Sequence, residues 1–382
     1  MVGNREMPTP AEPTENLAEE LERVHPELAA VREAASEPVY LVGGAVRDLL
    51  LGLGRADIDL VVEGDAAALA ARLGADVVSH QRFATAKVRL DHHEVDIASA
   101  RAESYPHPGA LPVVEPAASV EADLARRDFT VNSMAIPLDG EPRLIDPHGG
   151  CADLAAGMLR VLHPRSFVDD PTRALRAARY AARFDFELEP RTAALLQEAD
   201  LATVSVDRRD AELLRLATEA EAPRAFALAA EWMLVEPRDG GIELASRAAE
   251  LLAAEPWAKA APRDRVLFAA ALGPAGGEEA IAVARPERPS EAVALASSHD
   301  PIELVLARAL GAEWLDRYLT EWQSIALEIE GADLITAGVP QGPAIGRGLR
   351  EALRRKLDGE ISGRDEELAA ALEVARSGDG VA

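Results

Sequence analysis

Strand and helix patterns alternate in only one part of the chain, between residue 38 and about residue 150. There "PVYLVGG" and "ADIDLVV" predict strands, "VRDLLLGL" and "GDAAALAARLG" predict short helices, and "TAKVRL" with "HEVDIAS" predicts two strands around a turn. After about residue 165 the pattern is almost entirely helical. A chain of 382 residues with this division is expected to fold as an α+β head with a mixed sheet, followed by an all-helical remainder.

Composition and chain breaks divide the sequence further. Residues 1–36 are polar and acidic, with an amphipathic helix predicted over 15–35 and about a dozen disordered residues expected before it. The head is expected over 37–162 and a helical neck over 163–235. A helical body and tail is expected over 236–382. Within the head, residues 101–119 are rich in proline and are predicted to be a loop or lid rather than a regular element.

Cysteine and charge usage bound the class of protein. Cys151 is the only cysteine, which excludes an intramolecular disulfide and a CxxC metal site and favours a reducing cytoplasm. No run of 18 apolar residues occurs, so no membrane span is expected. The net charge of −26 argues against a nucleic-acid partner, although a local stripe of cations can oppose it. All but three of the 40 cations are arginines, the better residue for planar, bidentate recognition.

Two aspartates interrupt the apolar strand that "ADIDLVV" predicts. Successive side chains of a strand point to opposite faces, so Asp57 and Asp59 share one face. Neighbouring carboxylates repel one another and lose hydration, so the arrangement is costly unless a cation binds there. Taken alone, the stretch is more simply interpreted as a solvated strand end with two ordinary aspartates.

The surrounding sequence favours a metal and phosphate site instead. A strand, the pair Gly43-Gly44 and a helix precede the aspartates, and such a turn lets backbone N–H groups approach a phosphate, with Arg47 beside it. Mg²⁺ is usually held by one or two carboxylates together with substrate phosphates. Asp96 in "HHEVDIAS" is a candidate third carboxylate. Together these features predict nucleotidyl transfer, in which a hydroxyl is activated for attack and pyrophosphate leaves.

An arginine-rich helix is predicted over 168–184, "VDDPTRALRAARYAARF", with Asp169 or Asp170 as its cap. At about 100° per residue, its four arginines lie within an arc of roughly 120°. They are Arg173, Arg176, Arg179 and Arg183. A solvated amphipathic face is the common interpretation of such a helix. Asp170 beside Arg173 favours a base reader, because a carboxylate and a guanidinium match the amino group and ring nitrogen of adenine and cytosine and oppose those of guanine and uracil.

Taken together, these stretches resemble the class II tRNA nucleotidyltransferase and bacterial poly(A) polymerase family. "LVGGAVRDLLLG" with "DIDLVVEGD" is similar to the family's metal and triphosphate motif, and "DLARRDFTVNSMA" (123–135) to its ribose motif. "IDPHGGCADL" (145–154) resembles the hinge between head and neck, the helix at 168–184 the base template, and 208–233 the helical motif that follows. The resemblance covers roughly residues 38–235, and 236–382 matches only as generic helical body and tail.

The resemblance implies a nucleotidyltransferase-fold head and addition of CCA to tRNA 3′ ends from CTP and ATP, with Mg²⁺ as cofactor. Neither DNA nor a membrane is implied as a partner, and the oligomeric state is left open. The residues implied are Asp57 and Asp59 for Mg²⁺, Gly43, Gly44 and Arg47 for the nucleotide, Arg127 and Asp128 for the ribose 2′-OH, and Asp170, Arg173, Arg176 and Arg179 for the base and phosphates. The sequence departs modestly from the family, with Asp169 where many members have Glu and "FATA" (83–86) in place of "FGTA".

Several alternatives share parts of this pattern. A CC-adding or A-adding enzyme carries the same motifs, and a poly(A) polymerase is disfavoured because "RGLREALRRK" (347–356) is the only basic run after residue 300. That run is interpreted either as a contact with a tRNA backbone or as a solvated helix face. A non-catalytic RNA-binding protein is disfavoured by the intact Asp57 and Asp59. A metal phosphohydrolase built on His299 and Asp300 is rejected, because no other histidine cluster accompanies them.

Overall fold

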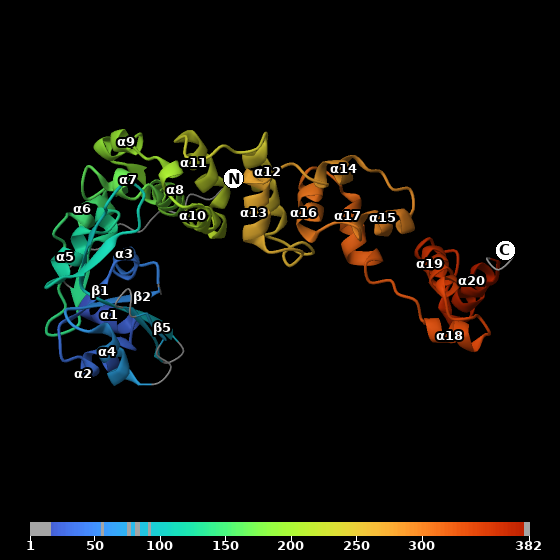
Figure 1. Cartoon of the computed structure of the whole chain (residues 1–382), viewed down its shortest axis with the longest axis horizontal. Helices are drawn as coiled ribbons and strands as arrows, with labels where there is room; N and C mark the ends of the chain where they lie inside the picture. The colour runs from blue at the N-terminus through green and yellow to red at the C-terminus, as the bar shows by residue number, and fades with distance from the viewer. Residues whose placement is uncertain (1–16, 55–56, 75–77, 81–84, 91–92, 378–382) are drawn as a thin grey trace. The chain divides into compact units, whose positions relative to one another are not determined.

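The computed structural model describes residues 17–54, 57–74, 78–80, 85–90 and 93–377, and predictions for the first 16 residues and for Phe83 and Ala84 lie outside this part. The chain divides into two compact units, Met1–Val235 and Glu236–Ala382. Figure 1 shows the helices and strands of both units, coloured from the N-terminus to the C-terminus. Among the described residues, no helix has the length and apolar character needed to cross a membrane.

The N-terminal helical pattern forms two helices instead of the single one predicted over 15–35. Helix α1 (Leu17–Val24) ends at the His25-Pro26 pair, and α2 (Leu28–Ala34) begins two residues later. Pro26 has no N–H to continue the helical ladder, which explains the interruption. Apolar side chains of both helices, Leu21 and Leu28 among them, are buried in the same core as the sheet that follows.

A mixed six-stranded sheet forms the centre of the head. Its strand order is β3-β4-β5-β2-β1-β8, and only β2 and β5 run parallel, which confirms the mixed sheet expected from the sequence. The strands are β1 (Val39–Val42), β2 (Ile58–Val62), β3 (Val78–His80), β4 (Thr85–Leu90), β5 (His93–Ser99) and β8 (Ala135–Pro137). Helices α3 (Gly44–Leu50) and α4 (Ala66–Leu73) follow β1 and β2.

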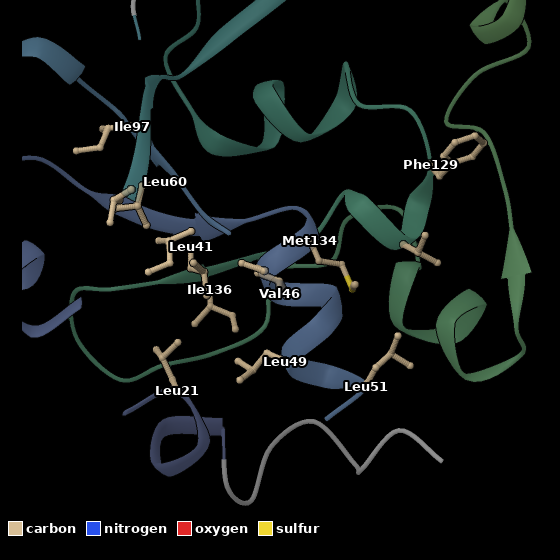
Figure 2. Packing of buried hydrophobic residues seen from close by; sticks show 14 of the residues in the cluster. Leu21, Leu41, Val46, Leu49, Leu51, Leu60, Ile97, Phe129, Met134 and Ile136 are labelled. Atoms are coloured by element: carbon tan, nitrogen blue, oxygen red, sulfur yellow. The ribbon is translucent and has the colours of Figure 1, made fainter. Parts of the chain in front are cut away.

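Alternate residues of the central strands enter two different cores. Leu41 of β1 and Leu60 of β2 belong to the large core that contains helices α1 to α4, and Figure 2 shows Val46 and Leu49 of α3 beside this face of the sheet. Val42 and Val61 belong instead to a smaller core with α5 (Val120–Ala125). The period-two alternation therefore decides which face each strand residue occupies, including the polar ones.

The structure corrects the expectation for residues 101–119. Instead of a loop without regular structure, β6 (Arg101–Ser104) and β7 (Val113–Pro116) pair as an antiparallel hairpin. Proline does not prevent this pairing, because three of the four prolines in the segment lie in the β6–β7 connection (residues 105–112) and the fourth is the last residue of β7. At those positions the missing N–H costs no ladder hydrogen bond.

The rest of the first unit is mainly helical and contains the arginine-rich helix α8 (Thr172–Phe184). Its buried alanines, together with Leu175, pack inward as the helical spacing predicts. The other elements here are the 3₁₀ turn η2 (Thr130–Asn132), α6 (Gly150–Ala155), β9 (Met158–Leu159), α7 (Ser166–Asp169), β10 (Glu187–Leu188), α9 (Pro190–Leu196), the 3₁₀ turn η3 (Leu201–Thr203), α10 (Val206–Thr218) and α11 (Ala222–Glu231).

The regular elements of the second unit are all helices among its described residues. It comprises α12 (Gly241–Leu251), α13 (Arg263–Leu272), α14 (Glu278–Val283), α15 (Pro289–Ala296), α16 (Pro301–Ala309), α17 (Trp314–Arg317), the π-helical turn η4 (Tyr318–Trp322), α18 (Gly331–Thr336), α19 (Pro343–Leu357) and α20 (Gly363–Ser377). Asp300 of the "SSHD" stretch accepts the Ile302 backbone N–H at 2.8 Å and caps α16.

The basic run on α19 is largely neutralised inside its own unit. Arg354 donates to Glu351 at 2.9 Å, Arg355 donates to the same carboxylate at 2.8 Å, and Lys356 lies 2.6 Å from Glu367. The two arginine hydrogen bonds lower the pKa of Glu351 to about 2. Most of the positive charge predicted for this run is therefore compensated by carboxylates.

Candidate active site

A cavity of about 510 Å³ in the first unit collects most of the predicted site residues. It lies between the smaller-core face of the sheet, the segment after α5 and the arginine face of α8, all of which contribute side chains. Eleven of the twelve residues predicted for the site line it, namely Gly43, Gly44, Arg47, Asp59, Asp96, Arg127, Asp128, Asp170, Arg173, Arg176 and Arg179. Asp57, the twelfth, is exposed and lies just before β2.

The carboxylates of Asp59 and Asp96 lie on neighbouring parallel strands. The two residues are direct partners in the β2–β5 register. Each alternates with residues of the large core, so both side chains take the opposite face, where the cavity lies. Burial raises the pKa of Asp59, and the negative charges of Asp96 and Asp57 raise it further against the opposing guanidinium of Arg127. Asp57 is therefore close enough to act on Asp59 electrostatically.

The carboxylate pair fits a divalent cation with oxygen ligands. The negative charge of Asp59 is destabilised by burial, and Nζ of Lys87 lies 3.2 Å from Oδ2 of Asp96. In the part of the chain described, no group of three or more histidine, cysteine, aspartate or glutamate side chains is arranged around a common metal position. Mg²⁺-type sites commonly use only one or two carboxylates and complete their shell with water and phosphate, so the residues present suffice.

The glycine turn brings the chain close to Arg127. Gly43 has a φ of +69°, and a Cβ there would meet Nη1 of Arg127 at 2.5 Å, so only glycine fits. Arg127 is itself held by Asp123, whose Oδ2 accepts from Nη2 at 3.1 Å. The Nε of Arg127 is buried and has no hydrogen-bond partner among the described residues. A bound anionic group would satisfy this donor.

Arg47 takes a different place from the one its position in the sequence suggests. Its side chain is buried, its Nε donates to Asp48 at 2.8 Å, and its Nη1 donates to Asn132 at 2.6 Å. Its guanidinium also lies over the ring of Phe184, 4.4 Å from the centroid. Arg47 therefore joins α3 to α8 as well as lining the cavity, and a contact with the triphosphate remains a prediction.

Asp128 and Arg176 form a buried ion pair between the head and α8. Nη2 of Arg176 lies 2.7 Å from Oδ2 of Asp128, while Asn132 donates to Oδ1 of the same carboxylate at 2.9 Å. Burial alone would raise the pKa of Asp128, but the charge of Arg176 and the hydrogen bond from Asn132 outweigh it and hold the pKa far below its usual range. Asp128 is therefore ionised across the physiological range.

Asp170 and Arg173 both face the cavity, but each is held by other partners. Asp170 accepts from the hydroxyl of Thr172 at 2.6 Å and from Arg208 at 3.0 Å. Arg173 donates to Ser166 Oγ at 2.7 Å and to the carbonyl of Arg126 at 2.8 Å. The two side chains predicted to read a base are thus held by different partners, Asp170 by residues of the neck and Arg173 by Ser166 of the neck together with Arg126 of the head.

Several residues of the site were missed by sequence reasoning. Asn132 links Arg47 to Asp128, Asp123 holds both Arg126 and Arg127, and Tyr105 lies 3.4 Å from Arg173. Only Asp123 had a sequence signal, because residues three and four positions apart on a helix are neighbours. Arg183, noted on the arginine arc but not assigned to the site, also lines the cavity.

The arginine content of the cavity opposes the charge of the whole chain. Among the described residues, seven arginines and five carboxylates line it, although the chain carries a net charge of −26. The additional arginines beyond those predicted are Arg126 and Arg183. A locally positive cavity in an acidic protein can attract a polyanionic substrate.

Comparisons with known proteins agree with this geometry. Residues 39–160 match the family model of the poly A polymerase head domain. The A-adding tRNA nucleotidyltransferase of Halalkalibacterium halodurans is 44% identical over 201 residues, which cover 49% of this chain and 47% of that protein. The CC-adding tRNA nucleotidyltransferase of Deinococcus radiodurans is 35% identical over 363 residues, which cover 89% of this chain and 90% of that protein.

A solved structure extends the agreement to the helical part. The CCA-adding enzyme of Thermotoga maritima, in its complex with tRNA-CCA, matches with a TM-score of 0.72 and 28% identity over 93% of this chain and 97% of that one. The match to the Halalkalibacterium protein, by contrast, spans about half of that protein's length.

The fold and the cavity together define a nucleotidyltransferase head with a helical extension, as the sequence motifs predicted. The nearly full-length match to the Deinococcus protein is more specific, because it includes the helices after the head. The chain belongs to the family of tRNA nucleotidyltransferases and poly(A) polymerases. Nucleotidyltransferases of this fold use a divalent metal with their nucleotide substrates.

Proposed function

We propose that this chain adds CCA to the 3′ ends of tRNA from CTP and ATP, releasing pyrophosphate and using no nucleic-acid template. One observation carries the proposal: a single cavity holds the carboxylates of Asp59 and Asp96 together with Asp170 and Arg173 of the neck. Nucleotide transfer needs the carboxylates of Asp59 and Asp96 beside the reacting phosphate. Selection of a base without a template needs Asp170 and Arg173 beside that base. Because the two sets line one cavity, we propose that a single nucleoside triphosphate contacts both.

Asp57 and Asp59 are the proposed Mg²⁺ ligands, with Asp96 as a third carboxylate. When bound, the ion lowers the pKa of the terminal ribose hydroxyl and stabilises the charge on the leaving pyrophosphate. The raised pKa of Asp59 supports this assignment, because a carboxylate cluster of this kind gains stability when a cation enters it. The glycine turn at Gly43 and Gly44 leaves room for the triphosphate to approach the backbone.

The neck is proposed to select the incoming base. The carboxylate of Asp170 accepts the amino group of cytosine or adenine, and Arg173 donates to the adjacent ring nitrogen. Uracil and guanine would place an acceptor against Asp170 and a donor against Arg173, which rejects them. Arg176 and Arg179 on the same helix face contact the phosphates or the base, and Arg127 and Asp128 contact the ribose.

The remaining parts of the chain have proposed roles in holding tRNA. Residues 37–162 form the catalytic head, 163–235 the neck, and 236–382 a body and tail that contacts the tRNA, with the acidic segment 1–36 before them. In α19 this contact would rest on Arg347 and Arg350, since Arg354, Arg355 and Lys356 are paired with carboxylates. Neither DNA nor a membrane is proposed as a partner, and the reducing cytoplasm is the proposed compartment.

A partial enzyme is the second candidate. The Deinococcus relative that aligns with 89% of this chain is a CC-adding enzyme, and the Halalkalibacterium relative with 44% identity is an A-adding one. Both assignments use the same cavity, so its geometry does not discriminate between them. The difference lies in which terminus of tRNA is accepted and whether ATP is used.

The product is tested by offering the purified chain three tRNAs, ending at the discriminator base, at C and at CC, with labelled CTP and ATP. The proposal predicts one CCA triplet on the first tRNA. The length and composition of the products are measured on sequencing gels. A tRNA ending in CCA is the control and should receive nothing.

Each alternative has its own result in this assay. Stalling after CC identifies a CC-adding enzyme, and action only on the tRNA ending in CC identifies an A-adding enzyme. Open-ended A tails identify a poly(A) polymerase. Binding of tRNA without any extension would overturn the proposed activity and leave an RNA-binding protein.

A further inference from the structure

We propose that Lys87 is a positioning residue of the metal site, which holds the carboxylate of Asp96 and lowers the affinity of the site for a divalent ion. The inference rests on the proposed function, because it concerns the carboxylates assigned there to the metal. Lys87 belongs to β4, whose first residue, Thr85, lines the cavity, but Lys87 itself is not among the lining residues. Its effect on the ion is therefore exerted through its charge and through Asp96.

The strand register places three charged residues in a row across the sheet. Lys87 of β4 is the register partner of Asp96 of β5, and Asp96 is the register partner of Asp59 of β2. Directly opposed residues of neighbouring strands point their side chains to the same face of a sheet and lie about 5 Å apart. A lysine and two aspartates therefore follow one another on the face that carries the cavity.

The burial pattern of β4 fixes the face on which Lys87 lies. Ala86, Val88 and Leu90 are buried in the large core. Lys87 and Arg89 alternate with them, and their side chains are 51% and 64% exposed. The strand cannot turn over without exposing three apolar side chains and burying two charges. The charge of Lys87 therefore stays on the metal-site face of the sheet.

The ammonium group of Lys87 lies against the Asp96 carboxylate. Its Nζ is 3.2 Å from Oδ2 of Asp96, which is within hydrogen-bond distance, and 3.9 Å from Oε2 of Glu94. A carboxylate oxygen beside an ammonium is a weaker ligand for a metal, because part of its negative charge is already compensated. Since the Asp96 side chain is 46% exposed, a metal ion can still reach it and compete with Lys87.

Lys87 opposes a divalent ion at Asp59 and Asp96 in two ways. The ammonium has to share Asp96 with the ion or give it up, and its positive charge repels the ion across a few ångströms. In a solvated site, this repulsion between a single and a double charge is large enough to change the binding constant about tenfold. Because Mg²⁺ sites of this kind complete their shell with substrate phosphates, a site that is weak in the free chain fills when the nucleotide arrives.

The inference is tested by titrating the full chain with Mn²⁺, a paramagnetic probe of Mg²⁺ sites, without nucleotide or tRNA. Free Mn²⁺ is measured by electron paramagnetic resonance. Only binding that Asp59→Asn abolishes is counted, because an acidic chain binds the ion elsewhere as well. Lys87→Met keeps a long apolar side chain and removes the charge, so it should bind Mn²⁺ about tenfold more tightly than the wild type. Lys87→Gln should show the same gain, and Lys87→Arg, which keeps the charge, should bind like the wild type.

Arg89→Met is the matched control. Arg89 lies on the same strand and the same face as Lys87, and its Nη2 is 4.0 Å from Glu94, its register partner. The substitution removes one positive charge from a position about 7 Å further along β4. Screening reduces the effect of an exposed charge at that distance, so Arg89→Met should change the Mn²⁺ affinity by less than about threefold.

Three results would overturn the inference. The first is an affinity of Lys87→Met that equals that of the wild type, and the second is one that falls below it, which would show that Lys87 prepares Asp96 for the metal. The third is an equal gain in Arg89→Met, because the effect would then belong to the charge of the whole surface. Thermal unfolding in a chelator confirms that each variant is folded at the temperature of the titration.

Nucleotide addition by the same chains separates this inference from the proposed function. Tighter Mn²⁺ binding by Lys87→Met, in a chain that extends no tRNA, would support the inference and overturn the proposed activity. CCA addition by a wild type whose Mn²⁺ affinity matches that of Lys87→Met would support the activity and overturn the inference.

Discussion

Replacing Asp59 with alanine is expected to lower the rate of nucleotide addition by about a thousandfold or more. Stabilisation of transition-state charge by a bound metal is worth several kcal/mol, and each 1.36 kcal/mol changes a rate about tenfold. Asp59 lines the cavity and is the register partner of Asp96 in the sheet, so its removal takes away one of the two carboxylates that line the proposed metal site. Single-turnover addition of labelled CTP to tRNA measures the effect.

The isosteric change Asp59→Asn should separate the function of Asp59 from its effect on stability. Burial and the neighbouring carboxylates raise its pKa in the folded chain, so its ionised form destabilises the fold when no metal is bound. We therefore expect Asp59→Asn to be inactive but to unfold at an equal or higher temperature than the wild type in the presence of a chelator.

The raised pKa of Asp59 also determines how the stability of the chain changes with pH. Because the pKa of Asp59 is higher in the folded than in the unfolded state, its contribution favours folding at low pH and is lost as pH rises through the folded value. The advantage of Asp59→Asn in Tm should thus grow as pH is raised from about 4 to 7. Asp139→Asn, at an exposed position of the head, is the control for the Tm measurement. In the activity measurement, retained nucleotide addition by Asp59→Ala would contradict the assignment of Asp59 as a metal ligand.

Replacing Arg176 with methionine is expected to destabilise the chain by about 2–3 kcal/mol. The substitution leaves Asp128, which is 8% exposed, with an uncompensated negative charge, and breaking a buried ion pair usually costs about 3–5 kcal/mol. We take a lower value because the Arg176 side chain is 27% exposed and because Asn132 still donates to Asp128. Chemical denaturation at neutral pH measures the difference.

Lowering the pH should reduce the difference in the free energy of unfolding between the wild type and Arg176→Met. The pKa of Asp128 is lowered in the folded chain, so the ion pair stabilises folding above about pH 4 and this contribution is lost as pH falls further. The stability of the wild type and of Arg176→Met should therefore converge toward pH 2. A gap that stays constant with pH would show that the ion pair is not its source.

Two further variants complete this test. Asp128→Asn combined with Arg176→Met removes both charges and should recover part of the lost stability, because no buried charge remains unpaired. Arg224→Met removes an arginine that pairs with Asp185 at an exposed position of the neck. It should change the free energy of unfolding by less than about 1 kcal/mol, as surface ion pairs do.

Local patterns in the sequence identified most elements around the site. The strand, glycine and helix order at residues 39–50, the alternation around Asp59, and the arginine face of α8 all depend on residues close together in the chain. Such features follow from the periods of strands and helices, which short sequences display fully. The family resemblance and the mixed-sheet head, both confirmed, rest on these same stretches.

Where the prediction was wrong, pairing between distant residues was responsible. The proline-rich segment 101–119 was expected to lack regular structure, yet β6 and β7 pair across an eight-residue connection. Composition describes each residue separately and does not state which backbone lies opposite. The helix expected over 15–35 was divided by Pro26, whose missing N–H outweighed the amphipathic pattern on both sides.

The sequence by itself determined which residue types are available to the site: neighbouring carboxylates, a glycine turn and a face of arginines. Only the tertiary structure decided how they combine, since it placed Asp96 beside Asp59, turned Arg47 toward Asn132, and joined Arg208 to both Gly109 and Asp170. The physical reason is range. Periodicity sets the face of each side chain within a few residues, whereas a hydrogen bond needs two groups within about 3 Å, which only the packing of distant segments can bring about.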